Sequence, residues 1–113
     1  MNNSPSRSFD ITLLGATGFV GILTAEYLAA HAPADVRIAL AGRNQAKLEA
    51  LREKLTASHP RAADFPLVIA DSSDNRSLEK LARDTRVVIS TVGPYYRYGF
   101  PLVRECATHG THY

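Results

Sequence analysis

Three glycines recur at intervals of three residues near the start of the sequence, in the stretch LLGATGFVG (residues 13–21). An apolar run typical of a buried strand precedes them, and a pattern typical of a helix follows them. At such a junction Gly15 is expected to permit a tight turn, Gly18 to let the backbone approach a bound group, and Gly21 to let helix and strand pack closely. The free N–H groups at the helix N-terminus would then bind an anion, and a pyrophosphate fits that place.

The spacing of these glycines, G-x-x-G-x-x-G, has a wider first interval than the common dinucleotide-binding pattern G-x-G-x-x-G. Such a set is not specific by itself, because glycines can also serve only to pack a turn. Their position between a strand pattern and a helix pattern favours binding of a dinucleotide over packing alone.

The end of the next apolar run indicates which dinucleotide would bind. NAD sites commonly place a carboxylate at this point, where it hydrogen-bonds to the ribose 2′-hydroxyl, whereas NADP sites lack it and have a cation nearby. In this sequence the run ends in LAGRN, so Gly42 leaves space and Arg43 can make paired hydrogen bonds to a 2′-phosphate. The alternative is a solvated arginine at the start of a helix, but the pattern favours NADP.

Two further segments are expected near the same ligand, because open parallel sheets bind ligands beyond the carboxyl ends of their strands. Asp71 and Ser72 follow the third apolar run, where the Asp71 carboxylate either accepts a hydrogen bond from an adenine amino group or caps the next helix together with Asp74. The segment STVGPY (residues 90–95) follows the fourth run, where Gly93 would let the ribose and nicotinamide pass close to the backbone.

The elements that must position these residues follow from apolar periods that alternate between strand-like and helix-like. The predicted strands are 9–15, 36–42, 65–71 and 86–93, and the predicted helices are 19–31, 44–58, a short one after Asp74, and 98–110. Strands that alternate with helices across short loops predict an α/β fold with parallel pairing and right-handed crossovers. We therefore expect the first half of a Rossmann-type doubly wound sheet, with strand order 3-2-1-4.

Within these helices, the pattern also predicts caps and faces. Asn44 and Asp74 are expected to be N-caps. The large apolar residues of the first helix recur at three- and four-residue spacing and are expected on one side, as in an amphipathic helix: Val20, Leu23, Tyr27 and Leu28.

Length and composition limit the function classes. The 113 residues are enough for one domain, and hydrophobic residues at 45% and charged residues at 21% are ordinary for a globular protein. The net charge of +2 comes from interspersed signs, which disfavours nucleic-acid binding. The sequence has one cysteine, Cys106, and scattered histidines, so neither an internal disulfide nor a metal site is expected. We expect a reducing, cytoplasmic setting instead. No apolar run approaches membrane-spanning length.

Three stretches, GATGFVG, AGRN and STVGPYYRYGFPLVRECATHGTHY, resemble the N-terminal NADP-binding domain of saccharopine dehydrogenase-like proteins, which include the trans-acting enoyl reductases. The resemblance spans residues 9–113 and leaves 1–8 as an expected disordered tail. It implies cofactor contacts at Gly15, Thr17, Gly18, Phe19, Val20, Gly21, Arg43, Asn44, Asp71, Thr91, Val92 and Gly93.

Members of this family continue past the equivalent of Tyr113 with the rest of the sheet and a substrate and dimerisation domain. The resemblance therefore implies that residues 9–113 are an incomplete, truncated dinucleotide-binding domain, and that substrate and homodimer contacts belong to a domain absent from this chain. It also implies an oxidoreductase that transfers hydride from NADPH to a C=N or activated C=C bond. The alternative is a noncatalytic NADP(H)-binding module or redox sensor.

No catalytic residue is assigned from the sequence. No tyrosine has a lysine four residues on, as the short-chain reductases require. Cys106 falls on the inward face of a predicted helix, which favours a core role over a nucleophilic one. His109 and His112 have no evident orienting partner, so surface or interdomain positions are favoured for both.

Overall fold

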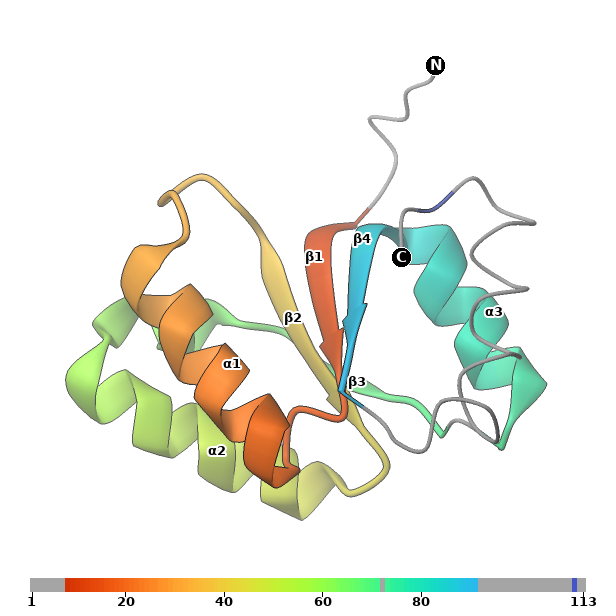
Figure 1. Ribbon diagram of the computed structural model, residues 1–113, viewed down its shortest axis with the longest axis horizontal. Helices are drawn as coiled ribbons and strands as arrows, with labels where there is room; N and C mark the ends of the chain where they lie inside the picture. Colours follow the sequence, from red (N-terminus) through yellow and green to blue (C-terminus); the bar gives the residue numbers. More distant parts are fainter. Residues whose placement is uncertain (1–7, 72, 92–110, 112–113) are drawn as a thin grey trace.

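The computed structural model describes residues 8–71, 73–91 and 111, and it contains one parallel sheet with helices on both faces (Figure 1). The strands are β1 (Phe9–Leu14), β2 (Ile38–Gly42), β3 (Leu67–Ile69) and β4 (Thr85–Ser90). The helices are α1 (Phe19–His31), α2 (Gln45–Ser58), the 3₁₀ helix η1 (Pro60–Asp64) and α3 (Asn75–Asp84). The strands pair in the order β3-β2-β1-β4, which confirms the predicted Rossmann-type topology.

The sheet separates two hydrophobic cores. Helices α1 and α2 cover one face and α3 covers the other (Figure 1). Because successive strand residues point to opposite faces, Leu13 packs with the α1 and α2 side chains, whereas Leu14 packs with those of α3. All five residues of β2 are buried, as expected for a central strand covered on both sides.

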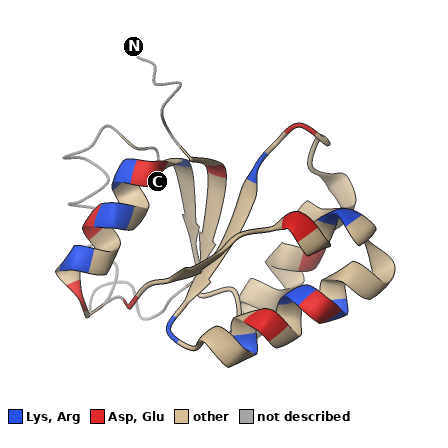
Figure 2. Ribbon diagram, turned by 180° about the vertical axis from the view of Figure 1, so that it is seen from behind, with Lys and Arg blue, Asp and Glu red and all other residues tan. Residues whose placement is uncertain are grey.

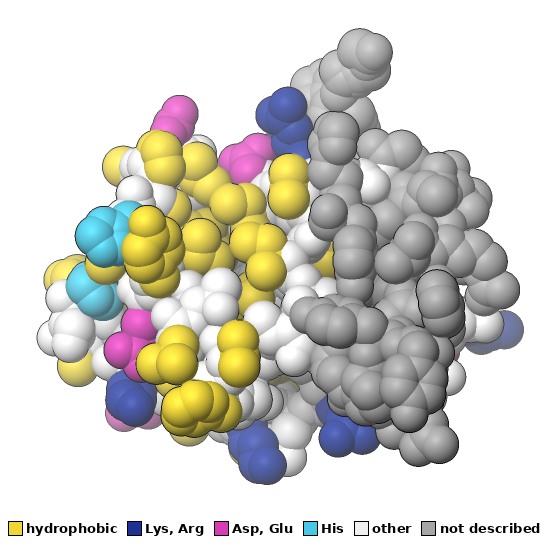
Figure 3. Space-filling model, in the orientation of Figure 1, with side chains coloured by type: hydrophobic (Ala, Val, Ile, Leu, Met, Phe, Trp, Pro, Cys, Tyr) yellow, Lys and Arg dark blue, Asp and Glu magenta, His cyan; other side chains and the backbone are white. Residues whose placement is uncertain are grey.

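Helix α1 packs on the sheet through its small residues. Its buried residues are Gly21, Ala25 and Ala29. The sequence predicts four large apolar residues on one side of this helix. Three of them do lie on a common side, but that side is exposed: Val20, Leu23 and Tyr27. Figure 3 shows hydrophobic side chains gathered on this outer face of α1. The fourth, Leu28, packs against the core.

The other two long helices follow the usual amphipathic pattern. The buried residues are Leu48, Leu51 and Leu55 in α2 and Leu78, Leu81 and Ala82 in α3. In Figure 2, the ribbons of both helices carry the colours of charged residues along their length. Their predicted N-caps, Asn44 and Asp74, are confirmed by hydrogen bonds to backbone N–H groups.

Several predicted boundaries are too wide. Strand β3 covers only 67–69 instead of 65–71, because Phe65 closes the η1 turn through its N–H and Pro66 has no N–H to donate. Strand β2 begins at Ile38 instead of residue 36, since the Val36 N–H closes a turn onto the Pro33 carbonyl. The predicted helix 98–110 lies outside the described residues.

None of the helices in the described ranges combines the length and hydrophobicity needed to cross a bilayer.

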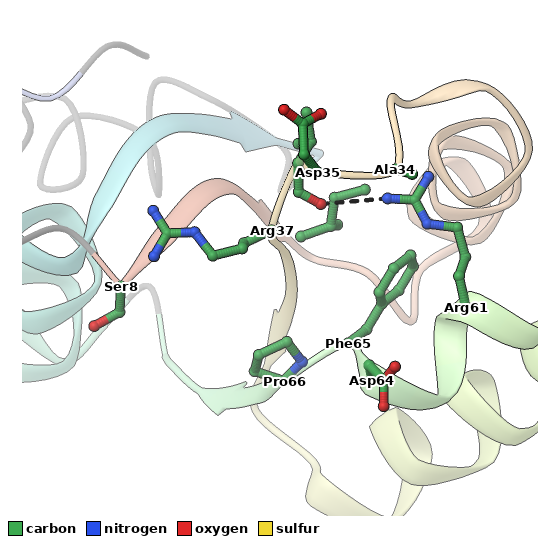
Figure 4. Close-up of a pocket in the computed structure, with 10 residues that line it drawn as sticks. Ser8, Ala34, Asp35, Arg37, Arg61, Asp64, Phe65 and Pro66 are labelled. Carbon is green, nitrogen blue, oxygen red and sulfur yellow. Dashed lines mark hydrogen bonds between the residues drawn. The ribbon is translucent and has the colours of Figure 1, made fainter. Parts of the chain in front are cut away.

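A cavity of about 250 Å³ lies at the amino end of the sheet, where β1 and β2 begin. It is lined in part by Arg37, Arg61, Phe65 and Pro66 (Figure 4). The Arg61 guanidinium lies 5.7 Å from the centre of the Phe65 ring and donates to three backbone carbonyls nearby. This end of the sheet is opposite the one to which the sequence assigns ligand binding.

Candidate functional site

The parallel strands bring the sequence-predicted residues together at one end of the sheet, here called the carboxyl end. Leu14 of β1 pairs with Ala41 of β2 and with Ser90 of β4, and Gly42 pairs with Ile69 of β3. The segments that follow these strands therefore emerge side by side. They carry the glycine loop (residues 15–18), Arg43, Asp71 and Thr91.

The glycine loop is shaped by two of its glycines. Gly15 has a φ of 83°, a conformation that favours glycine, and its N–H donates to the Ala41 carbonyl at 3.0 Å. A Cβ atom at Gly21 would lie 2.0 Å from the Gly15 carbonyl oxygen. Both residues must be glycine for α1 to start where it does, so the expected turn and packing roles are confirmed.

Gly18 is different, because internal packing does not require it. Of the residues that the structure describes, a Cβ atom there would meet only the Gly15 oxygen, at an ordinary 3.5 Å. Its φ of −77° and ψ of 170° are extended values that any residue adopts. A Cβ atom at position 18 would thus be clear of the rest of the described chain.

The N-terminus of α1 also lacks the side-chain cap that the two other long helices have. Asn44 accepts the Lys47 N–H at 3.1 Å and Asp74 accepts the Arg76 N–H at 3.0 Å. The N-cap of α1 is Gly18, which has no side chain to accept a hydrogen bond. Among the described residues, no side chain therefore caps the first turn of α1, and such a helix start favours an anion through both hydrogen bonding and the helix dipole.

Arg43 follows β2 directly and is exposed. Within the described ranges its guanidinium makes no hydrogen bond or ion pair, although its charge contributes to lowering the pKa of Asp71. At the neighbouring Gly42, a Cβ atom would touch only the Leu48 side chain, at 3.5 Å or more. The end of β2 therefore presents a free cation and no carboxylate.

Asp71 orders the turn before α3. Its Oδ1 accepts the Ser73 N–H at 2.9 Å and the Ser73 hydroxyl at 2.8 Å. These two bonds, with a smaller contribution from Arg43, hold the pKa of the Asp71 carboxyl below its usual value. The helix cap is Asp74, so of the two expected roles of Asp71, direct capping of α3 is not observed.

Ser73 is not among the residues predicted for this site, although it is the partner of Asp71. The signal was present, because an aspartate followed two residues later by a serine is typical of an Asx turn.

Thr91 joins the end of β4 to the glycine loop. Its N–H donates to the Leu14 carbonyl at 3.0 Å, and its hydroxyl lies 3.1 Å from that oxygen and 3.0 Å from the Gly15 oxygen. The other expected contacts near this point, Ser72, Val92 and Gly93, lie outside the described residues.

Comparison with known proteins agrees with this geometry. The model of the family "Saccharopine dehydrogenase NADP binding domain" matches residues 11–113. Trans-acting enoyl reductases from Mycobacterium ulcerans and Mycobacterium tuberculosis (strain H37Rv) are 50% identical over 111 residues and 54% identical over 107 residues. The matches cover 98% and 95% of this chain but 26% and 25% of those proteins, so the chain spans about a quarter of their length.

Among solved structures, saccharopine dehydrogenase (L-Glu forming) from Saccharomyces cerevisiae is 26% identical, with a TM-score of 0.71. The match covers 91% of this chain and 20% of that one. The family match extends over nearly the whole sequence and includes the glycine loop, Arg43 and the end of β4. The chain therefore belongs to the saccharopine dehydrogenase NADP-binding domain family, and its cofactor is NADP.

Proposed function

We propose that the carboxyl end of the sheet binds NADPH with its pyrophosphate at the N-terminus of α1. The observation that carries this proposal is the start of α1, where, among the described residues, no side chain caps the first turn and none lies against position 18 within 4 Å. A pyrophosphate satisfies such N–H groups and is favoured by the helix dipole. In this arrangement Gly15 and Gly21 shape the loop, and Gly18 allows the phosphates to approach.

Arg43 is proposed to bind the 2′-phosphate that distinguishes NADPH from NADH. Its guanidinium is exposed and makes no hydrogen bond or ion pair within the described ranges, so no internal interaction has to break. A planar guanidinium can donate two parallel hydrogen bonds to a phosphate. Asp71 lies on the neighbouring strand end, where its carboxylate would face the adenine.

The remaining contacts of the proposed site come from the same loops. They are Thr17, Phe19, Val20, Asn44, Ser72, Val92 and Gly93, with Thr91 as a neighbour whose hydroxyl is bonded to the glycine loop. Phe19, with 81% of its surface exposed, is a large apolar side chain beside the proposed phosphate position. Such a side chain would shield a bound dinucleotide from water on that side.

In the complete protein, this domain is proposed to hold NADPH while its nicotinamide passes hydride to a C=N or activated C=C bond of a small-molecule substrate. The proposal is supported by the family and by relatives named trans-acting enoyl reductases. The substrate contacts, and those of a homodimer, would come from a separate domain, because the chain spans about a quarter of those relatives. A cytoplasmic location belongs to the same proposal and rests on the single cysteine.

Calorimetric titration of the chain with NADPH and NADH tests the cofactor assignment. We expect NADPH to bind at least tenfold more tightly, since hydrogen bonds to a charged group contribute about 1.5–3 kcal/mol. Arg43→Ala should remove most of the difference by weakening NADPH alone, while Arg83→Ala, a matched exposed arginine at the other end of the sheet, should change neither affinity. Equal affinities for the two dinucleotides in the unsubstituted chain would contradict the assignment.

A further inference from the structure

The Gly15 carbonyl oxygen is the centre of the glycine loop. It accepts the Gly18 N–H at 3.1 Å and lies 3.0 Å from the Thr91 hydroxyl. It also occupies the space that a Cβ atom at Gly21 would need. The orientation of this one peptide group thus affects both the turn and the first residues of α1.

Neighbouring strands hold this peptide from two sides. On the β2 side, the N–H groups of Gly15 and Ala16 donate to the Ala41 carbonyl at 3.0 and 3.2 Å. On the β4 side, the hydroxyl proton of Thr91 is shared between the carbonyls of Leu14 and Gly15. Thr91 follows β4 directly, and its side chain reaches the loop beyond the end of β1.

We propose that Thr91 is a positioning residue for the phosphate site, and that its hydroxyl acts by fixing the Gly15 peptide rather than by touching the cofactor. This inference rests on the proposed placement of the pyrophosphate at the start of α1. The one proton of this hydroxyl already has two carbonyl acceptors within the protein, those of Leu14 and Gly15, so donation to a phosphate oxygen would break that bond. Its effect on binding therefore passes through the loop.

The physical basis is preorganisation. Binding is tighter when the donor groups already have the orientation that the ligand needs, because less freedom is lost on association. Gly15 has no side chain to restrict its backbone, so its orientation depends on the hydrogen bonds that it makes. Without the Thr91 hydroxyl, the Gly15 carbonyl keeps only the bond from Gly18 among the described residues, and the start of α1 becomes less well defined before the ligand arrives.

The test compares Thr91→Val, which has nearly the same shape but no hydroxyl, with Thr91→Ser, which keeps the hydroxyl. We expect Thr91→Val to weaken NADPH binding by about tenfold and Thr91→Ser to stay within about threefold of the unsubstituted chain. The dissociation constants are measured by calorimetry. A second probe, adenosine 2′-monophosphate, lacks the pyrophosphate, and its affinity measured by NMR titration should be the same in all three proteins.

Thr85→Val is the matched control. Thr85 lies at the other end of β4 and makes a buried hydroxyl–hydroxyl hydrogen bond of 2.7 Å to Thr12 of β1. Its loss should lower the melting temperature, because a buried polar group loses its partner, and should leave NADPH affinity unchanged. Thr91→Val should show the opposite pattern, with a small change in melting temperature and a large change in affinity.

The outcomes separate this inference from the proposed function. If the unsubstituted chain binds no NADPH, the proposed function fails and the inference fails with it. If that chain binds NADPH and Thr91→Val binds it equally well, only the role of Thr91 is overturned. Equal losses in Thr91→Val and Thr91→Ser, or a loss of adenosine 2′-monophosphate binding in Thr91→Val, would overturn the role as well.

Discussion

The two ends of the sheet use the same kinds of groups in opposite ways. At the amino end, Arg61 donates to the carbonyls of Ala32, Pro33 and Val36, and Arg37 pairs with Asp10. At the carboxyl end, Arg43 is exposed without a hydrogen bond or ion pair in the described ranges, and the start of α1 has no side-chain cap.

This difference implies that the amino end of the sheet contributes to the stability of the fold and the carboxyl end to ligand binding. A donor that is already bonded inside the protein holds elements together and has little left for a ligand, as Figure 4 shows for Arg61 beside Phe65. A donor that only water satisfies can exchange that water for a ligand at small cost to the fold. Substitutions at the amino end should therefore change stability without affinity, and those at the carboxyl end should do the reverse unless they alter the backbone.

The largest effect is expected at Gly21, which breaks this division. Gly21→Ala puts a Cβ atom 2.0 Å from the Gly15 oxygen, so α1 must move away from the turn. We expect a loss of about 3 kcal/mol in the free energy of unfolding, together with loss of NADPH binding. Urea denaturation followed by circular dichroism gives the first quantity, and calorimetry gives the second.

Gly18→Val is the comparison for that substitution. The backbone at position 18 is extended and has room for a Cβ atom, so the free energy of unfolding should change little. NADPH binding should nevertheless be lost, because a branched side chain fills the proposed phosphate space. A Gly21→Ala protein as stable as the unsubstituted chain would contradict the packing argument. A Gly18→Val protein that still binds NADPH would mean that these glycines serve packing only.

A smaller effect is expected at Arg61, which holds the end of α1 to the start of β2. Arg61→Met keeps much of the apolar contact with Phe65 but leaves three carbonyls without this donor. We expect it to lower the free energy of unfolding by about 2 kcal/mol, with unchanged NADPH affinity. The measurements are urea denaturation and calorimetry.

Arg52→Met is the control, because Arg52 donates to a single carbonyl, that of Phe65, at 3.1 Å. Its effect on stability should be about half that of Arg61→Met. A change in NADPH affinity in Arg61→Met would mean that the two ends of the sheet are coupled.

The sequence predicted the topology well because each element carries independent signals. The strand order followed from the alternation of strand and helix patterns, and the caps at Asn44 and Asp74 followed from short-range chemistry that tertiary packing leaves unchanged. The glycine loop was predictable for the same reason, because the turn at Gly15 and the close contact at Gly21 both depend on residues only a few positions apart.

The exposed face of α1 is where sequence reasoning was insufficient. A repeat of large apolar residues at helical spacing usually marks the buried side, but here small residues face the sheet. The cause is the close approach of α1 to the turn after β1, which only residues such as Gly21 and Ala25 permit. The partner of a carboxylate is similarly hard to predict, because both Asp71 and Asp74 precede α3 and only the geometry shows that Asp71 accepts from Ser73 while Asp74 caps the helix.

The smallest predicted effect concerns the pH dependence of stability at the amino end. Asp10 accepts hydrogen bonds from the Arg37 side chain at 3.3 Å and from the Arg37 N–H at 2.8 Å. These bonds hold the pKa of the Asp10 carboxyl below its usual value, and those from the Arg37 side chain contribute most. A lowered pKa means that the charged form stabilises the fold above the usual carboxyl pKa of about 4, and that this contribution is lost as the pH falls through the lowered value.

Asp10→Asn should therefore be less stable than the unsubstituted chain at pH 7, and the difference should shrink as the pH is lowered below about 4. The effect should be small, because the Arg37 side chain is 52% exposed and water screens the pair. Melting temperatures measured between about pH 3 and pH 7 give the profile. Asp35→Asn, an exposed aspartate at the same end, serves as the control and should leave the profile unchanged. A difference between Asp10→Asn and the unsubstituted chain that does not depend on pH would show that packing, rather than the charge on Asp10, joins β1 to Arg37.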